Sequence, residues 1–267
     1  MLNRRHFVYG TALAPFAMRA TASVAEELDF DSAAPFRFAE NDVVPTLDEY
    51  ETQIEALTGA ANPFKEERAL AKALLKDIPT KATPYEVAWR FHLWRANKVP
   101  DKTPAELADY SYYSREWPVR GNPVIMGFFD ATGLRKISGD TTYWCAAFVS
   151  WCIQRSQLGK GINSHGGWPY AEGAASQAYA SWGRDVEKDL KEQPRKGDLV
   201  VLHHPKKPGT GHVTFYHGPV DDDTFLGLGG NQGAQNERNG GEVNIAAFNR
   251  SSTGLKLHSF RRLDALG

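Results

Sequence analysis

The chain of 267 residues has little that fixes a function by composition alone: two cysteines, no excess of one charge and no long apolar run. Its 31 basic residues are balanced by 32 acidic ones, so no basic excess exists to neutralise phosphates, and we do not expect a nucleic-acid binder. No apolar run approaches the about 20 residues that span a bilayer, so stable membrane insertion is not expected either. Hydrophobic residues still make up 42% of the chain, which is enough for a packed core.

Metal-binding patterns are also missing. The cysteines and eight histidines show no zinc spacing. The run Asp221-Asp222-Asp223 lacks the alternating ligand positions of a calcium loop, so a polar turn is the better interpretation. We expect neither a metal nor another cofactor.

The two cysteines, Cys145 and Cys152, do not suit a disulfide. Residues 143–155 have the pattern of one helix, in which seven residues separate the two Cα atoms by about 10 Å. A disulfide needs Cα atoms within about 7 Å of each other. At least one free thiol is therefore expected, either buried or reactive.

The first 25 residues have the order of a secretory signal: Arg4-Arg5, then a modest apolar run, then small residues that end at Ala25. The paired arginines favour twin-arginine export, and an ordinary basic amphipathic start is the alternative. We expect a mature protein outside the cytoplasm, either periplasmic or associated with the cell wall.

The rest of the chain divides into two regions. Residues 26–117 form a helical extension of unknown role, which could pack on a catalytic domain, restrain access to it or bind a partner. Its helices are expected at 64–78, 84–96 and 104–114. Residues 118–267 begin with helices, expected from 123, at 143–155 and at 171–182. Strands are expected at 199–202, 213–216, 225–228, 243–248 and 255–260, so the fold class is α+β with an antiparallel sheet.

Cys145 is the candidate nucleophile. With Thr142 as N-cap it would lie in the first turn of its helix, where unpaired N–H groups and the helix dipole favour the thiolate. Cys152, two turns further on, suits a small buried apolar residue, which is also the alternative for Cys145. A thiolate that attacks a carbonyl carbon needs a general base near it.

His212 is the candidate base, because it begins a strand after a glycine-bearing loop, where an imidazole can reach a groove. Residues 212 and 231 lie almost symmetrically about the turn at 221–223. In a regular hairpin, Asn231 would therefore lie beside His212 and could accept a hydrogen bond from the ring, as the third member of a triad does. His203, His204 and His217 are weaker candidates, since they border a loop or alternate to the other face.

Four blocks of sequence, taken in order, resemble the CHAP-type, NlpC-like cell-wall cysteine hydrolases: 122–123 with 142–152, 197–201, 211–213 and 228–232. The resemblance covers about residues 120–263. It implies a papain-like fold, with a helix that bears the cysteine packed on an antiparallel sheet that bears the histidine. It also implies hydrolysis of amide bonds in peptidoglycan, as an endopeptidase or an N-acetylmuramoyl-L-alanine amidase.

Carried onto this chain, the resemblance makes Cys145 the nucleophile, His212 the base and Asn231 the orienting residue. The backbone N–H of Cys145 and the neighbouring Tyr143 are the candidate oxyanion donors, and Tyr143 and Trp144 could contact substrate. Peptidoglycan or its fragments would be the partner, and the sequence identifies no regulatory protein. Alternatives are a cysteine acyltransferase or peptidase acting on a non-wall substrate, a non-catalytic wall-binding module and an interbacterial toxin.

Overall fold

The computed structural model describes most of the chain after residue 64. The described residues are 65–117, 121–134, 140, 142–158, 174–233 and 241–262. The predicted signal segment 1–25 and the first part of the predicted extension lie outside these ranges, as do His165 and the first residues of the helix predicted at 171–182.

The helices of the described N-terminal part begin and end close to where the sequence predicts them. They are α2 (Lys65–Lys76), α3 (Pro84–Arg95), α4 (Pro104–Tyr113) and α5 (Pro123–Phe128), which continues into the short 3-10 helix η1 (Phe129–Ala131). Helices α3 and α4 each start with a Thr-Pro-x-Glu capping box, in which the threonine and the glutamate satisfy each other's backbone N–H groups. Asn122 caps α5 through its side chain.

Two predicted helices differ from the structure. Helix α6 (Cys145–Leu158) begins at Cys145 rather than at residue 143, and its first hydrogen bond runs from Phe148 N–H to the Trp144 carbonyl. The helix predicted up to Trp182 is, over its described part, the 3-10 helix η2 (Ser176–Ser181). There the Gln177 side chain donates to the Leu202 carbonyl at 2.7 Å. The short 3-10 helix is thus hydrogen-bonded to the sheet.

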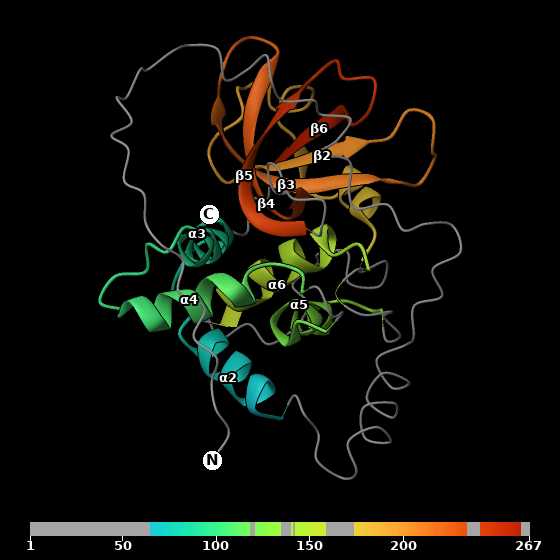
Figure 1. Ribbon diagram of the computed structural model, residues 1–267. Coiled ribbons are helices and arrows are strands. Elements are labelled where there is room, and N and C mark those ends of the chain that lie inside the picture. The colour runs from blue at the N-terminus through green and yellow to red at the C-terminus, as the bar shows by residue number, and fades with distance from the viewer. Residues whose placement is uncertain are drawn as a thin grey trace, which may run out of the picture.

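The C-terminal part forms one antiparallel sheet in the order β1-β6-β2-β3-β4-β5. The strands are β1 (Arg184–Asp185), β2 (Leu199–His203), β3 (Gly211–Pro219), β4 (Thr224–Gly233), β5 (Gly241–Asn249) and β6 (Lys256–Arg262). Four of them contain the predicted strands, and β6 begins one residue after the start of the strand predicted at 255–260. The two-residue β1 has too little pattern to be predicted. The helices gather on one side of this sheet (Figure 1), so the α+β class expected from the sequence is confirmed.

The two faces of the sheet carry separate groups of buried apolar residues. The larger group joins the helices to one face through Leu199, Val201, Val213, Phe215 and Leu228. A smaller group lies on the other face and consists of Val186, Val200, Leu202, Tyr216, Phe225, Phe248 and Phe260. Alternate residues of β2 and β3 thus enter different cores, as the strand period of two requires.

The described part of the extension packs into the larger of these cores. The Phe91 ring of α3 lies edge-on to Phe128, Phe148 and Trp151, at centroid distances of 5.2, 5.5 and 5.5 Å. Trp94 of the same helix is fully buried. Helix α3 therefore supports the helix that bears Cys145.

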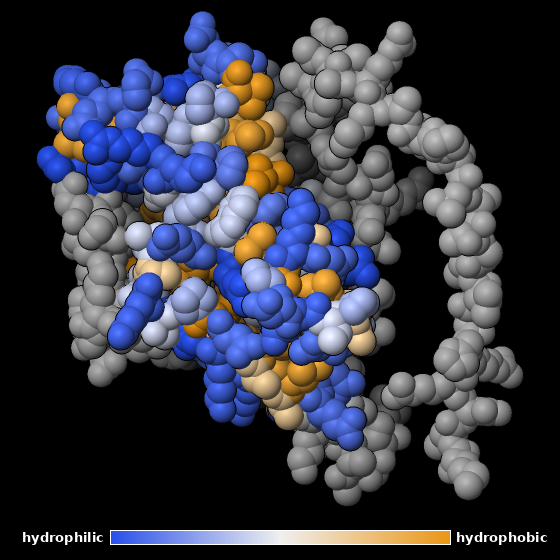
Figure 2. Space-filling view, turned by 90° about the vertical axis from the view of Figure 1, so that its left-hand side faces the viewer, coloured by the Kyte–Doolittle hydropathy of each residue, from blue (hydrophilic) through white to orange (hydrophobic). Residues whose placement is uncertain are grey.

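The described part of the chain exposes few large apolar side chains. Hydrophilic residues cover most of the face in Figure 2, and apolar ones occupy small separate areas. The exposed large apolar residues among those described are Tyr112, Leu134, Tyr143 and Val220. No described helix is long and apolar enough to cross a membrane.

Candidate active site

Cys145 is the first residue of α6, and its side chain is buried, with 4% of the residue exposed. Three backbone N–H groups, those of Val213, Ala146 and Cys145 itself, favour the thiolate. Burial nevertheless dominates and raises the pKa of the Cys145 thiol to about 11. The helix start thus favours the thiolate as expected, but desolvation outweighs it and the thiol is protonated in this structure.

His212 is the second residue of β3 and pairs with Leu202 of β2. Its imidazole stacks on the Phe248 ring, with centroids 5.6 Å apart, and only 2% of the residue is exposed. Burial lowers the pKa of His212 to about 4, against an opposing contribution from its hydrogen bond with Gln232. The ring is therefore neutral at pH 7 and able to accept a proton.

The start of α6 and the start of β3 meet at the peptide group that joins His212 to Val213. The N–H of this peptide points to the Cys145 sulfur. Within the described structure, no hydrogen bond links the sulfur to the imidazole itself. The structure thus brings the Cys145 sulfur to the backbone beside His212, in the larger core with Val213, whereas the imidazole stacks on Phe248 of the smaller core. The thiol and the imidazole are both neutral at rest.

Asn231 lies at the same place but contacts the helix rather than the imidazole. The pairing Phe215↔Leu228 has the register that the hairpin argument assumed, yet β3 and β4 are not paired beyond it toward Asn231. There β4 is bulged and Asn231 has a φ of 56°. Oriented by its hydrogen-bond partners, its amide accepts from Trp144 N–H at 3.3 Å and donates to Glu116 Oε1 at 3.2 Å.

Gln232 is the side chain that contacts the base. Its Oε1 lies 3.2 Å from His212 Nε2, and the residue is 3% exposed. The sequence does not predict this contact, because a regular hairpin assigns it to residue 231. The signal was present in the next position of the same Gly-Gly-Asn-Gln block, since glutamine has the same amide on a side chain one methylene longer.

The two residues before Cys145 have different environments. Tyr143 is 47% exposed, so its phenol is available at the surface beside the cysteine. The Trp144 indole is fully buried and donates from Nε1 to Glu116 Oε1 at 2.8 Å. A Cβ on Gly230 would lie 2.3 Å from the Trp144 ring, so this glycine lets the indole pack directly on the strand backbone. Trp144 thus supports the start of α6 from inside.

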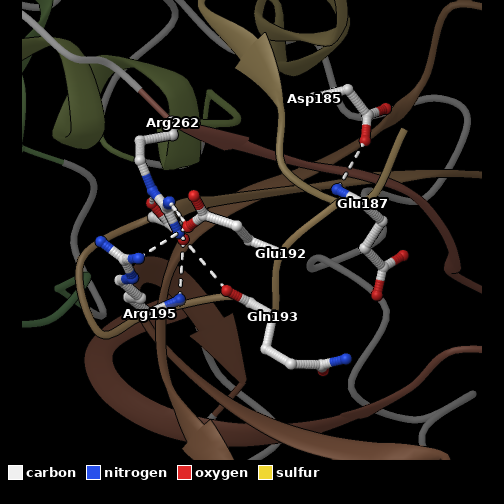
Figure 3. Close-up of polar contacts among 7 residues, drawn as sticks. Asp185, Glu187, Glu192, Gln193, Arg195 and Arg262 are labelled. Carbon is white, nitrogen blue, oxygen red and sulfur yellow. Dashed lines mark hydrogen bonds and ion pairs between the residues drawn. The ribbon is translucent and has the colours of Figure 1, made fainter. Parts of the chain in front are cut away.

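The Gly-Asp block at 197–198 builds a charged clamp away from the cysteine (Figure 3). Arg262 of β6 donates from Nε and Nη2 to the two carboxylate oxygens of Asp198, at 2.9 and 2.8 Å, and from Nη1 to Glu192 at 2.5 Å. Arg195 also binds Glu192. This block therefore ties the loop before β2 to the last strand.

The remaining described histidines have partners of other kinds. The Tyr85 hydroxyl lies 2.6 Å from His217 Nδ1, on the side of the sheet that α3 covers, whereas the His203 and His258 rings contact each other. His204 lies in the loop after β2 and accepts from Lys206 N–H. Among the residues that the structure describes, no group of three His, Cys, Asp or Glu residues is placed to hold a metal ion.

Among models of known protein families, one matches this chain. The model of the CHAP domain matches residues 137–231, which agrees with the family that the four sequence blocks resemble. The match contains Cys145, His212 and Asn231 and ends one residue before Gln232. CHAP domains are generally cysteine- and histidine-dependent amidohydrolases or peptidases. No curated protein and no solved structure matches the chain significantly.

Proposed function

We propose that this protein is an exported cysteine hydrolase that cleaves amide bonds in peptidoglycan, with Cys145 as nucleophile and His212 as general base. One observation carries the assignment: the sulfur at the start of α6 lies against the His212–Val213 peptide, inside the segment that matches the CHAP domain. Export rests on the signal pattern of the first 25 residues.

The resting charges define the first step of the proposed reaction. Since the thiol and the imidazole are both neutral, the Cys145 proton moves to His212 as the sulfur attacks the amide carbon, rather than before substrate binds. His212 then gives this proton to the leaving amine. An acyl-enzyme remains, and water activated by His212 releases it.

The backbone at the start of α6 can stabilise the developing oxyanion. The first N–H groups of a helix have no partner within the helix, and that of Cys145 is the first of α6. In this proposal the exposed Tyr143 lies at the edge of the site and contacts substrate. Asn231 acts through the helix, because its amide accepts from Trp144 N–H.

The test is digestion of purified peptidoglycan by the mature protein and by a Cys145→Ala variant, with released fragments identified by mass spectrometry. We expect new fragments from the wild type and a loss of about a thousandfold or more in the variant, because removal of a nucleophile costs this much in related mechanisms. The cleaved bond distinguishes an endopeptidase from an amidase.

Cys152→Ala is the matched control, because Cys152 is a fully buried thiol on the same helix. It is expected to retain activity. If the folded, reduced wild type releases nothing from peptidoglycan, the wall substrate is rejected, and peptide and protein amides become the next substrates to examine. If Cys145→Ala cleaves as fast as the wild type, the assignment of the nucleophile is wrong.

A further inference from the structure

A chain of hydrogen bonds runs from the imidazole of His212 to an ion pair with helix α3. Gln232 Nε2 donates to Asn244 Oδ1 at 2.8 Å and to the Asn244 carbonyl at 2.7 Å. Asn244 Nδ2 donates to Glu242 Oε1 at 3.0 Å. The other oxygen of Glu242 accepts from Arg95 Nε of α3. The chain therefore begins at the proposed base and ends on the extension.

The direction of these bonds fixes the protonation of the ring. Because Gln232 Nε2 faces carbonyl oxygens of Asn244 and Gly227, its Oε1 must be the atom that faces His212. An amide oxygen only accepts, so His212 Nε2 must carry the hydrogen. Nδ1 then has a free lone pair, which is the state a general base requires.

The members next to the ring are neutral and buried. Gln232 is 3% exposed, whereas the charge of Glu242 lies two amides away and is paired with Arg95. A carboxylate in direct contact would stabilise the imidazolium and so reduce the driving force for releasing its proton. An amide orients the ring without adding that charge.

The backbone leaves room for this arrangement. A Cβ on Gly229 would lie 2.7 Å from Gln232 Oε1 and 2.4 Å from Thr214 Oγ1. Both distances are far below van der Waals contact, so the Gln232 amide occupies space that depends on the missing side chain of Gly229.

We propose that Gln232 is the positioning residue of His212, and that Asn244 and the Glu242–Arg95 ion pair hold Gln232 in its orientation. Helix α3 then contributes to the site through Arg95, which gives the described part of the extension a part in catalysis. The catalytic consequence rests on the proposed function, whereas the orientation and protonation of the ring do not.

The first experiment measures the ring directly. ¹⁵N NMR of the histidine-labelled full-length protein reports which imidazole nitrogen carries the hydrogen. We expect the Nε2–H form for His212 in the wild type and a mixture of both forms in Gln232→Leu, which removes the acceptor. Gln193→Leu is the matched control, because the Gln193 side chain is exposed, and it should leave the His212 signals unchanged.

Gln232→Glu is the conservative second variant, and it keeps the inference falsifiable if Gln232→Leu does not fold. Its carboxylate still accepts from Nε2 and should raise the pKa of His212 by about one unit or more. A His212 titration that is the same in wild type and Gln232→Glu would overturn the contact. So would an Nδ1–H form in the wild type.

Kinetics on the substrate identified by the digestion test the catalytic part. We expect Gln232→Leu to lower kcat about tenfold to a hundredfold with little change in KM, and Gln232→Glu to recover part of the loss. An unchanged kcat in Gln232→Leu would reject the positioning role. If the wild type cleaves nothing, the proposed function fails while the NMR results still decide the contact with Gln232.

Discussion

Two polar networks of this molecule are built from different kinds of side chain, one mainly charged and the other mainly neutral. The clamp around Arg262 joins charged side chains at the end of strand β6 (Figure 3). In this clamp, Glu192 and Arg195 keep 40% and 69% of their side chains exposed. The chain at His212 consists of an imidazole and two amides beside the Phe248 ring, and its charges stand at the far end. The first fastens two segments of chain, and the second orients one ring.

The difference follows from what each network must do in its surroundings. At its exposed end, between Glu192 and Arg195, the clamp has a charged pair that desolvation penalises only weakly. At its buried end, the bidentate arginine satisfies both oxygens of the Asp198 carboxylate. In a buried site the same charges would fix the protonation state of a neighbouring titratable group. The pKa of His212, lowered to about 4, shows that burial keeps this ring neutral. The networks can therefore be disturbed separately.

The largest stability effect is expected from Arg262→Met. Asp198 keeps only 6% of its side chain exposed, so loss of the arginine leaves a buried carboxylate without its main partner. We expect the free energy of unfolding to fall by about 3–5 kcal/mol, measured by urea denaturation. The kcat of the folded fraction should stay within about twofold of the wild type, a rough limit for a site away from the reacting groups.

Arg195→Met is the control for that substitution, since it removes the exposed arginine of the same clamp. Surface pairs contribute about 0–1 kcal/mol, and a change within that range is expected. Equal losses in both variants would show that the buried contact with Asp198 has no special weight. A selective loss of kcat in Arg262→Met would mean that the two networks are coupled.

The second largest effect is expected from acid, which should lower the free energy of unfolding through protonation of His212. The pKa of His212 is lowered to about 4 by burial, whereas an unfolded histidine titrates near 6.5. Between these values the unfolded chain binds a proton that the folded chain does not, so stability is fully present above pH 6.5 and is lost as the pH falls. The total loss amounts to about 3 kcal/mol by pH 4.

Urea unfolding of the wild type and His212→Gln at several pH values from 7 to 4.5 measures this effect. The window excludes most of the titration of Glu192, whose pKa the Arg262 hydrogen bond holds below the usual 4.5. His212→Gln should lose less stability across the window than the wild type. His258→Gln should show a smaller difference of the same sign, because burial lowers the pKa of this part-buried ring as well. Equal slopes for all three proteins would contradict the low pKa of His212.

The smallest effect is expected at Asn231, which belongs to neither network and binds the residue just before helix α6. Asn231→Gly removes the amide that accepts from Trp144 N–H but tolerates the φ of 56°. We expect a loss of about 1 kcal/mol, as for other capping side chains, and a slightly larger loss for Asn231→Ala because of its Cβ. Thermal unfolding checks both. An alanine variant more stable than the glycine variant would show that the backbone at 231 relaxes.

The sequence predicted the elements well where periodicity and caps coincide. The two Thr-Pro-x-Glu boxes mark helix starts at residues 84 and 104, and alternating apolar residues mark the long strands. Local rules sufficed there because caps and strand faces depend on neighbours in sequence. The pairing Phe215↔Leu228 also has the expected register, but a bulge between Tyr216 and Gly218 produces it, since the pairs next to the turn are shifted by one residue.

The candidate site was harder to predict because its details depend on long-range packing. The bulge in β4 turns Asn231 to the helix and Gln232 to His212, and no pattern within the strand specifies that exchange. The neutral thiol of Cys145 likewise depends on how deeply α6 is buried. Cys145 and His212 could be identified as candidates from the sequence, because the motif depends only on residue types and their order.

The packing of Phe91 against the rings of α5 and α6 decides which part of this chain could be transferred to another protein. The family match begins at residue 137, some forty residues after helix α3 ends at Arg95. A fragment cut at the start of the match would uncover Phe148 and Trp151 and lose the arginine that pairs with Glu242. Transfer of the matched segment to another scaffold therefore requires α3 to be included.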